Sequence, residues 1–79
     1  MPPPTDIDRD LADVLRELRE AQGRSQETVS HEAGLTVATL ARIERRQSNP
    51  TWTTVARIAG ALGVSLAQLG GAVDQRRAG

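Results

Sequence analysis

Hydrophobic residues recur at steps of three and four along most of the chain, which is the spacing of amphipathic helices. The clearest stripe consists of Leu11, Val14, Leu15, Leu18 and Ala21. Four shorter stripes follow it: Val29 with Ala33, Leu40 with Ile43, Val55 with Ile58, Ala59 and Leu62, and Leu66 with Leu69. No segment alternates between apolar and polar residues as a strand does. The pattern predicts an all-α fold of five helices.

The residues that flank these stripes predict where each helix begins and ends. Ser, Thr and Asp favour N-caps, and glycine readily adopts the left-handed conformation that ends a helix. The predicted N-caps lie within residues 5–8 for the first helix and at Ser25, Thr36, Thr51 and Ser65 for the others. The predicted stops are Gly23, Gly34, Gly63 and the pair Gly70–Gly71. Residues 46–50 have the composition of a loop, so the third helix is expected over residues 36–45.

These elements fit one domain, expected over residues 6–71, with a single modest core. Residues 1–5, rich in proline, are predicted to be a disordered tail, and residues 72–79 are predicted to be a flexible C-terminal tail because they lack apolar periodicity. Trp52 is the sole aromatic residue and is expected to pack over the start of the fourth helix. The core must therefore be built from Leu, Ile, Val and Ala.

The composition argues against an enzyme. There is no cysteine, the one histidine, His31, falls on a polar helix face, and the acids are spread over helix surfaces. No glycine-rich phosphate loop follows a strand, so neither a cofactor nor a metal site is expected. No apolar run approaches the roughly 20 residues of a membrane span, and the polar start is unlike a signal peptide, so the cytoplasm is the expected location.

Charge is unevenly distributed although the net charge is zero. Residues 1–20 carry six acids and three arginines, whereas residues 35–57 carry four arginines and one acid, Glu44. The acids of the first helix are most simply interpreted as a solvated face. The basic middle is compatible with a surface that faces DNA. All ten basic residues are arginine, the better bidentate ligand for phosphate and guanine.

The second and third predicted helices are separated only by Gly34, Leu35 and Thr36. Ala33 and Gly34 are small enough for the helices to cross closely, Gly34 can take a positive φ, and Leu35 can fill the core between them. This is the spacing of a helix-turn-helix, whose second helix lies in the DNA major groove. Helical hairpins without DNA-binding activity share such spacing, so the spacing alone leaves both interpretations open.

From about Leu11 to Leu69 the sequence resembles the Cro and phage-repressor type of helix-turn-helix protein. The matching segments, in chain order, are LRELREAQG at 15–23, SQE at 25–27, AGLT at 33–36, LARIE at 40–44, NP at 49–50 and IAGALGVS at 58–65. The resemblance implies a compact five-helix, lambda-repressor-like DNA-binding domain. Its helix-turn-helix would be formed by the second and third helices.

The resemblance also implies roles for individual residues. Contacts to DNA bases are expected from Val37, Ala38, Thr39 and Arg42. Contacts to DNA phosphates are expected from Ser25, Gln26, Thr36, Arg45, Arg46 and Gln47. Gln26 is also expected to brace the recognition helix. Arg19 and Glu44 match a partly buried structural ion pair that ties the first helix to the end of the recognition helix.

The sequence departs from the family pattern in two places. Val37 and Ala38 stand where better-known members place amides or basic residues, and they can touch a thymine methyl group but cannot donate a bidentate hydrogen bond. Base recognition is therefore expected to rest on Thr39 and Arg42, supplemented by DNA shape. Arg46 stands where the family usually has glycine, so either a left-handed cap there is strained or the helix ends differently.

The expected function is sequence-specific binding of double-stranded DNA by a bacterial or phage transcriptional regulator, most simply a repressor. Its expected partners are an inverted-repeat operator and a second copy of the chain, which would form a homodimer through the fifth helix and the segment Leu66–Val73. The alternative is a protein-interaction module of the same fold, an antitoxin or adaptor. Zero net charge and the apolar start of the recognition helix favour that alternative slightly.

Overall fold

Each of the five helices in the computed structural model begins at a side-chain cap, as the sequence predicts. The structure describes residues 7–79, so the predicted tail at residues 1–5 lies outside the described residues. The helices are α1 (Arg9–Ala21), α2 (Gln26–Ala33), α3 (Val37–Glu44), α4 (Trp52–Leu62) and α5 (Leu66–Ala78). An oxygen of each N-cap side chain accepts a hydrogen bond of 3.0–3.1 Å from the backbone N–H three residues later. The N-caps are Asp8, Ser25, Thr36, Thr51 and Ser65.

The turn between α2 and α3 depends on glycine. Gly34 has a φ of +72°, a conformation that costs a side chain with a Cβ about 1–2 kcal/mol. The next residue, Leu35, donates its backbone N–H to the carbonyl of Ser30 at 2.8 Å, which closes the end of α2. Thr36 then caps α3. The expected stop at Gly34 is therefore confirmed.

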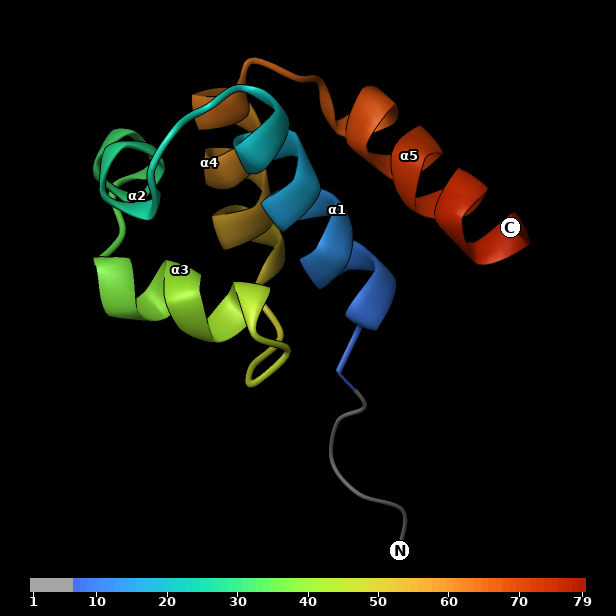
Figure 1. Ribbon diagram of the computed structural model, residues 1–79, viewed down its shortest axis with the longest axis horizontal. Coiled ribbons are helices and arrows are strands. Elements are labelled where there is room, and N and C mark those ends of the chain that lie inside the picture. Colours follow the sequence, from blue (N-terminus) through green and yellow to red (C-terminus); the bar gives the residue numbers. More distant parts are fainter. Residues whose placement is uncertain (1–6) are drawn as a thin grey trace, which may run out of the picture.

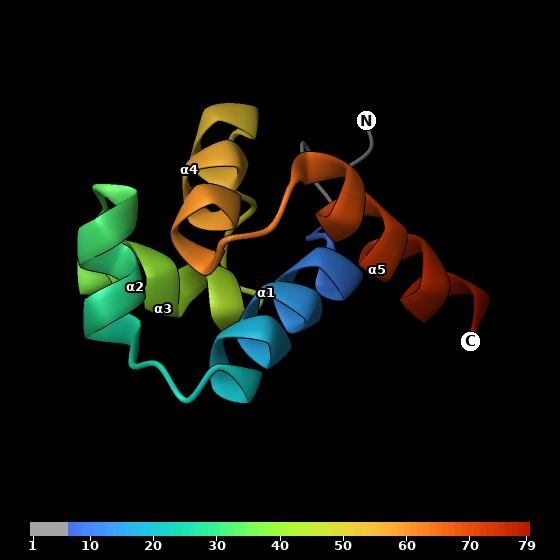
Figure 2. The same ribbon diagram turned by 90° about the horizontal axis from the view of Figure 1, so that it is seen from above.

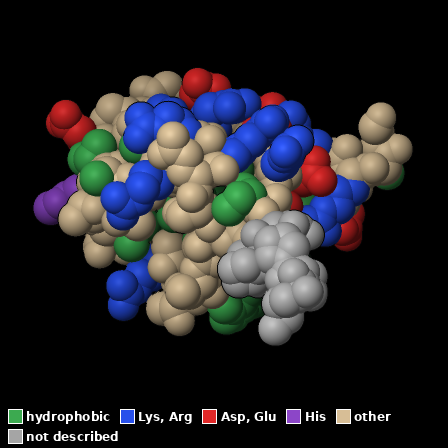
Figure 3. Space-filling view, turned by 90° about the horizontal axis from the view of Figure 1, so that it is seen from below, with side chains coloured by type: hydrophobic (Ala, Val, Ile, Leu, Met, Phe, Trp, Pro, Cys, Tyr) green, Lys and Arg blue, Asp and Glu red, His purple; other side chains and the backbone are tan. Residues whose placement is uncertain are grey.

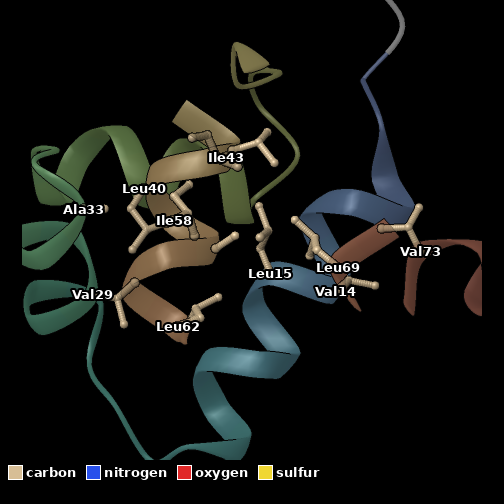
Figure 4. Packing of buried hydrophobic residues seen from close by; sticks show 12 residues of the cluster. Val14, Leu15, Val29, Ala33, Leu40, Ile43, Ile58, Leu62, Leu69 and Val73 are labelled. Atoms are coloured by element: carbon tan, nitrogen blue, oxygen red, sulfur yellow. The ribbon is translucent and has the colours of Figure 1, made fainter. Parts of the chain in front are cut away.

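The helices pack around α4, which lies against α2, α1 and α5. Figures 1 and 2 show α1 between α3 on one side and α5 on the other. The buried cluster contains only Leu, Ile, Val and Ala, as the near absence of aromatic residues requires (Figure 4). It consists of Val14, Leu15, Val29, Ala33, Leu40, Ile43, Val55, Ile58, Ala59, Leu62, Leu69 and Val73.

α4 and α5 meet at a bend of 100°. Gly63 ends α4 with a φ of +73°, and Val64 donates its backbone N–H to the carbonyl of Ala59 at 3.0 Å. Among residues 7–79 no single helix has the length and apolar character needed to cross a membrane. Only α4 and α5 taken together, with the bend between them, reach that length and apolar composition.

The fifth helix is longer than the sequence predicts. The expected stop at Gly70–Gly71 and the expected flexible tail at residues 72–79 are wrong, because α5 continues to Ala78. Val73 is buried against the core, one turn after Leu69. In the last turn of α5, Arg76 and Arg77 form ion pairs with acids of α1 and its cap. Burial of Val73 and these ion pairs hold a helix that its glycines would otherwise weaken.

Two further expectations for the surface are wrong. Trp52 does not pack over the start of α4, since 71% of its surface is exposed. The expected solvated face of α1 is wrong for Asp13, whereas Glu17 and Glu20 keep 51% and 58% of their side chains exposed. Asp13 is buried, with 3% of its side chain exposed, and Glu17 accepts hydrogen bonds of 2.8 and 2.9 Å from Arg76.

Candidate nucleic-acid interface

One face of α3 is exposed along its whole length. Ala38, Arg42 and Arg45 are exposed and follow one another at steps of four and three, so they form a single ridge. Val37, at the start of the helix, is 40% exposed. The opposite face is anchored in the core by Leu40, Ile43 and their neighbours. The exposed face of α3 therefore begins with the apolar residues Val37 and Ala38 and continues with Arg42 and Arg45.

Arginine side chains gather in a band on this side of the molecule (Figure 3). The view is from the lower side of Figure 1, where α3 and the loop that follows it lie. Arg42, Arg45 and Arg46 are all exposed. A surface of this kind attracts phosphate groups although the chain as a whole is neutral, because the acids of α1 and Glu44 are paired within the fold.

The first turn of α3 is organised by two threonines. The hydroxyl of Thr36 accepts a hydrogen bond from the backbone N–H of Thr39 at 3.1 Å and lies 2.9 Å from the hydroxyl of Thr39. Both residues were expected to contact DNA. The Thr39 hydroxyl accepts a hydrogen bond from Thr36, so its own O–H can still be donated to a base.

Glu44 ties the recognition helix to α1 and α2, as expected for a structural ion pair. Its carboxylate accepts hydrogen bonds from Nε and Nη2 of Arg19 at 2.8 and 2.9 Å. Nε2 of Gln26 donates to the same carboxylate at 2.9 Å. Only 3% of the Glu44 side chain and 13% of the Arg19 side chain are exposed. The pair with Glu44 raises the pKa of Arg19, although burial acts in the opposite direction. Gln26 thus braces α3 from the first turn of α2, and its backbone lies beside exposed Ser25.

The chain leaves α3 through a left-handed residue that is not glycine. Arg46 has a φ of +63°. Its N–H donates to the carbonyl of Ile43 at 3.1 Å, and the N–H of Gln47 donates to the carbonyl of Arg42 at 2.9 Å. These two bonds are those of a Schellman motif, in which the left-handed position normally belongs to glycine. At the position where the family usually has glycine, α3 therefore ends in a left-handed cap formed by Arg46.

The guanidinium of Arg46 is paired within the protein. Its Nε and Nη2 donate to the two carboxylate oxygens of Asp13 at 3.0 and 2.5 Å. This contact lowers the pKa of Asp13 below its ordinary value, although burial acts in the opposite direction, and it raises the pKa of Arg46. The expectation that Arg46 serves only as a phosphate ligand is incomplete, since the side chain also has a partner in α1.

Asp13 is the residue near this face that the sequence reasoning missed. The available signal was the spacing of Asp10, Asp13 and Glu17, which places three acids on one face of α1. Their partners come from distant parts of the chain, so the pairing could not be derived from spacing. The described residues contain no group of three His, Cys, Asp or Glu side chains that could hold a metal ion.

A family model described as helix-turn-helix matches residues 15–69. The chain belongs to the helix-turn-helix family. The matched segment includes α2, the turn at Gly34 and α3, and the expected five-helix fold with this motif is confirmed. No sequence among the curated proteins matches the chain.

Several solved helix-turn-helix proteins share this fold. The wild-type restriction-modification controller protein C.Esp1396I is 20% identical with a TM-score of 0.89, covering 95% of this chain and 99% of its own. C.Esp1396I was also solved as a tetramer in complex with its natural 35-base-pair operator (21% identity, TM-score 0.84, 90% of this chain and 93% of that one). The controller protein C.AhdI from Aeromonas hydrophila is 34% identical over 78% of this chain and 94% of its own, with a TM-score of 0.75. The clp gene regulator ClgR from Corynebacterium glutamicum is 21% identical over 96% of this chain and 81% of its own, with a TM-score of 0.84.

Proposed function

We propose that this chain, a DNA-binding transcription regulator of the helix-turn-helix family, binds an inverted-repeat operator as a homodimer and represses transcription by occupying a promoter. The observation that carries the proposal is the exposed ridge of Ala38, Arg42 and Arg45 on a helix that is fixed from behind by Glu44. The operator complex of C.Esp1396I, which has the same fold, supports it. We propose that the present chain only binds DNA, without a catalytic step, and that it does so at the nucleoid in the bacterial cytoplasm.

We assign base contacts to Val37, Ala38, Thr39 and Arg42 of α3. Arg42 is exposed and long enough to donate to the O6 and N7 atoms of guanine, the commonest specific contact in the major groove. Val37 and Ala38 are exposed beside it and fit a thymine methyl group. Thr39 supplies a hydroxyl that is oriented by Thr36.

We assign phosphate contacts to the residues around the ends of α2 and α3. Ser25 and Gln26 begin α2, and the free N–H groups at this helix end can bind an anion. The Gln26 amide has a second N–H besides the one that it donates to Glu44. Thr36 has the same position at the start of α3. Arg45 and Gln47 are exposed just beyond its other end. These contacts fix the register of α3 on the duplex and carry no base preference.

We keep the dimer surface at the fifth helix and extend it to the start of α4. Leu69 and Val73 are mostly buried in the core of the single chain, although both line a groove on its surface. Leu66, 37% exposed, and Trp52 remain on this side, beside a groove of about 390 Å³ that Leu11 and Val55 also line. We assign the interface between two copies to this groove and Trp52, because a protruding aromatic next to an apolar groove suits a self-complementary two-fold contact.

Replacing Trp52 by alanine is expected to weaken dimerisation. A buried tryptophan at the centre of an interface commonly contributes about 2 kcal/mol or more, which corresponds to a roughly 30-fold higher dissociation constant. Sedimentation equilibrium measures the dissociation constant, with Val37→Ala as the control, since Val37 is also exposed but does not line the groove. A wild-type chain that remains monomeric at high concentration and on DNA contradicts the assignment.

The salt dependence of duplex binding separates this proposal from a protein-interaction module. A helix-turn-helix that neutralises several phosphates releases counterions, so the logarithm of its affinity falls steeply with the logarithm of salt concentration. We expect a slope of about −4 or steeper for a dimer with several phosphate contacts per half-site. No binding to duplex DNA at low salt would contradict the proposal and favour a protein partner.

A further inference from the structure

One buried carboxylate joins three parts of the fold. Asp13 lies on α1, which Figures 1 and 2 show between α3 and α5. Its Oδ1 and Oδ2 atoms accept hydrogen bonds from Arg46, in the loop after α3. Its Oδ2 atom also accepts a hydrogen bond of 2.9 Å from Nη2 of Arg76, in the last turn of α5. With 3% of its side chain exposed, this carboxylate is shielded from solvent by its partners.

The pairing leaves one edge of Arg46 turned away from Asp13. A guanidinium is planar and carries five N–H donors in a fixed fork. Arg46 uses its Nε and Nη2 atoms for Asp13, and the adjacent Nη1–Nη2 edge keeps the N–H groups that point away from the carboxylate. The side chain is 44% exposed, directly after the exposed Arg45. Such an edge can bind one phosphate in the bidentate manner.

The backbone of Arg46 reinforces this arrangement. A left-handed conformation is unfavourable for arginine, and it persists where surrounding contacts fix it. Here the Schellman hydrogen bonds fix the backbone and Asp13 fixes the side chain. Asp13 of α1 therefore holds the direction in which the Arg46 side chain points.

Arg76 orients the carboxylate from the other side. It donates to Asp13 through Nη2 while Nη1 donates to Glu17 at 2.8 and 2.9 Å. The last turn of α5 is thereby connected through Asp13 to the loop after α3. No contact between α5 and DNA is needed for α5 to influence how Arg46 is held.

We infer that Asp13 is a positioning residue through which the end of α5 sets Arg46 against a DNA phosphate. This inference rests on the proposed DNA-binding function. It predicts that Arg76, a residue of α5 and not of the recognition helix, contributes to operator affinity, and that its contribution requires Arg46. The coupling is carried by a contiguous chain of charged hydrogen bonds, the kind of network that commonly changes affinity by about 2- to 30-fold.

The test is a double-mutant cycle on operator affinity at several salt concentrations. Arg46→Ala is expected to make the salt slope shallower by about 0.9 per half-site, the loss of one phosphate contact. Asp13→Asn and Arg76→Ala are each expected to weaken binding by about 3- to 10-fold. Neither is expected to weaken it further in the Arg46→Ala background.

Two controls match the changes in charge. Glu20→Gln removes the same charge as Asp13→Asn, about two turns along α1, and Glu20 pairs with Arg16 and not with Arg46 or Arg76. Arg77→Ala removes the same charge as Arg76→Ala from the same turn of α5, and Arg77 pairs with Asp8 and Asp10 instead. Both are expected to change affinity less than about twofold. Folded fraction and dimerisation are measured for every variant, and affinities are compared per folded dimer.

The outcomes distinguish the inference from the function on which it rests. If the wild-type chain binds no duplex, the proposed function fails and the inference falls with it. If the wild type binds but Arg76→Ala has the effect of Arg77→Ala, or retains its effect without Arg46, the coupling is wrong. Tighter binding by Asp13→Asn would also overturn it, since the carboxylate would then compete with phosphate for Arg46. Arg76→Ala decides the matter if Asp13→Asn does not fold.

Discussion

Replacing Glu44 by alanine is expected to lower the free energy of unfolding by about 3–5 kcal/mol. The substitution leaves the guanidinium of Arg19, 13% exposed, without its charged partner, and it removes the acceptor for Gln26. A domain of this size has a total stability of roughly 4–12 kcal/mol, so a large part of it would be lost. Denaturant unfolding followed by circular dichroism measures the change.

The control for this prediction is Glu20→Ala. Glu20 is also an acid paired with an arginine, Arg16, but its side chain is 58% exposed and the pair is 3.8 Å apart. Exposed pairs of this kind contribute about 0–1 kcal/mol. If Glu44→Ala costs no more than Glu20→Ala, Glu44 does not hold α3 in the way described above.

Ile58→Ala is expected to cost about 2–5 kcal/mol, the range for removing three buried carbons from a packed core. Ile58 is 1% exposed and belongs to the cluster that joins α4 to the other helices (Figure 4). In a small core without phenylalanine or tyrosine, few large side chains are present to move into the space. The same unfolding measurement applies.

Two further substitutions serve as references for the cost of Ile58→Ala. Ile58→Val removes one carbon at the same site and is expected to cost about 0.5–1.5 kcal/mol. Leu66→Ala, at a site that is 37% exposed, is expected to cost less than Ile58→Ala. Equal costs for the three substitutions would mean that the core is not packed as described.

The helix starts were predictable because their signals are local. Ser25, Thr36, Thr51 and Ser65 each bond to a backbone N–H three residues later, so a short stretch of sequence contains the whole interaction. The apolar stripes are equally local, and they identified nearly all of the buried cluster. The turn at Gly34 follows from the same kind of information.

The end of α5 was not predictable from local signals. Gly70 and Gly71 weaken a helix, and in an isolated segment they would mark its end. In the fold, Val73 packs into the core and Arg76 meets Glu17, 59 positions earlier in the chain. Long-range contacts of this kind outweigh the cost of two glycines, and the sequence does not display them.

The candidate site was predictable in part. The resemblance placed Arg19, Glu44 and Gln26 in roles that the hydrogen bonds now support. It could not provide the partner of Arg46, because the family usually has glycine there and Asp13 lies 33 positions away in the chain. The contacts of a residue that differs from the family pattern could therefore be found only in the structure.

Selection from a random pool of DNA duplexes tests the central claim most directly. The wild-type chain is predicted to enrich an inverted repeat whose half-site centres lie about 34 Å apart. Arg42→Ala is predicted to lose preference at one base pair in each half-site, worth about 1–3 kcal/mol, whereas Arg45→Ala is predicted to weaken binding while keeping the motif. Failure to enrich any motif, or an unchanged motif in Arg42→Ala, would contradict recognition by α3.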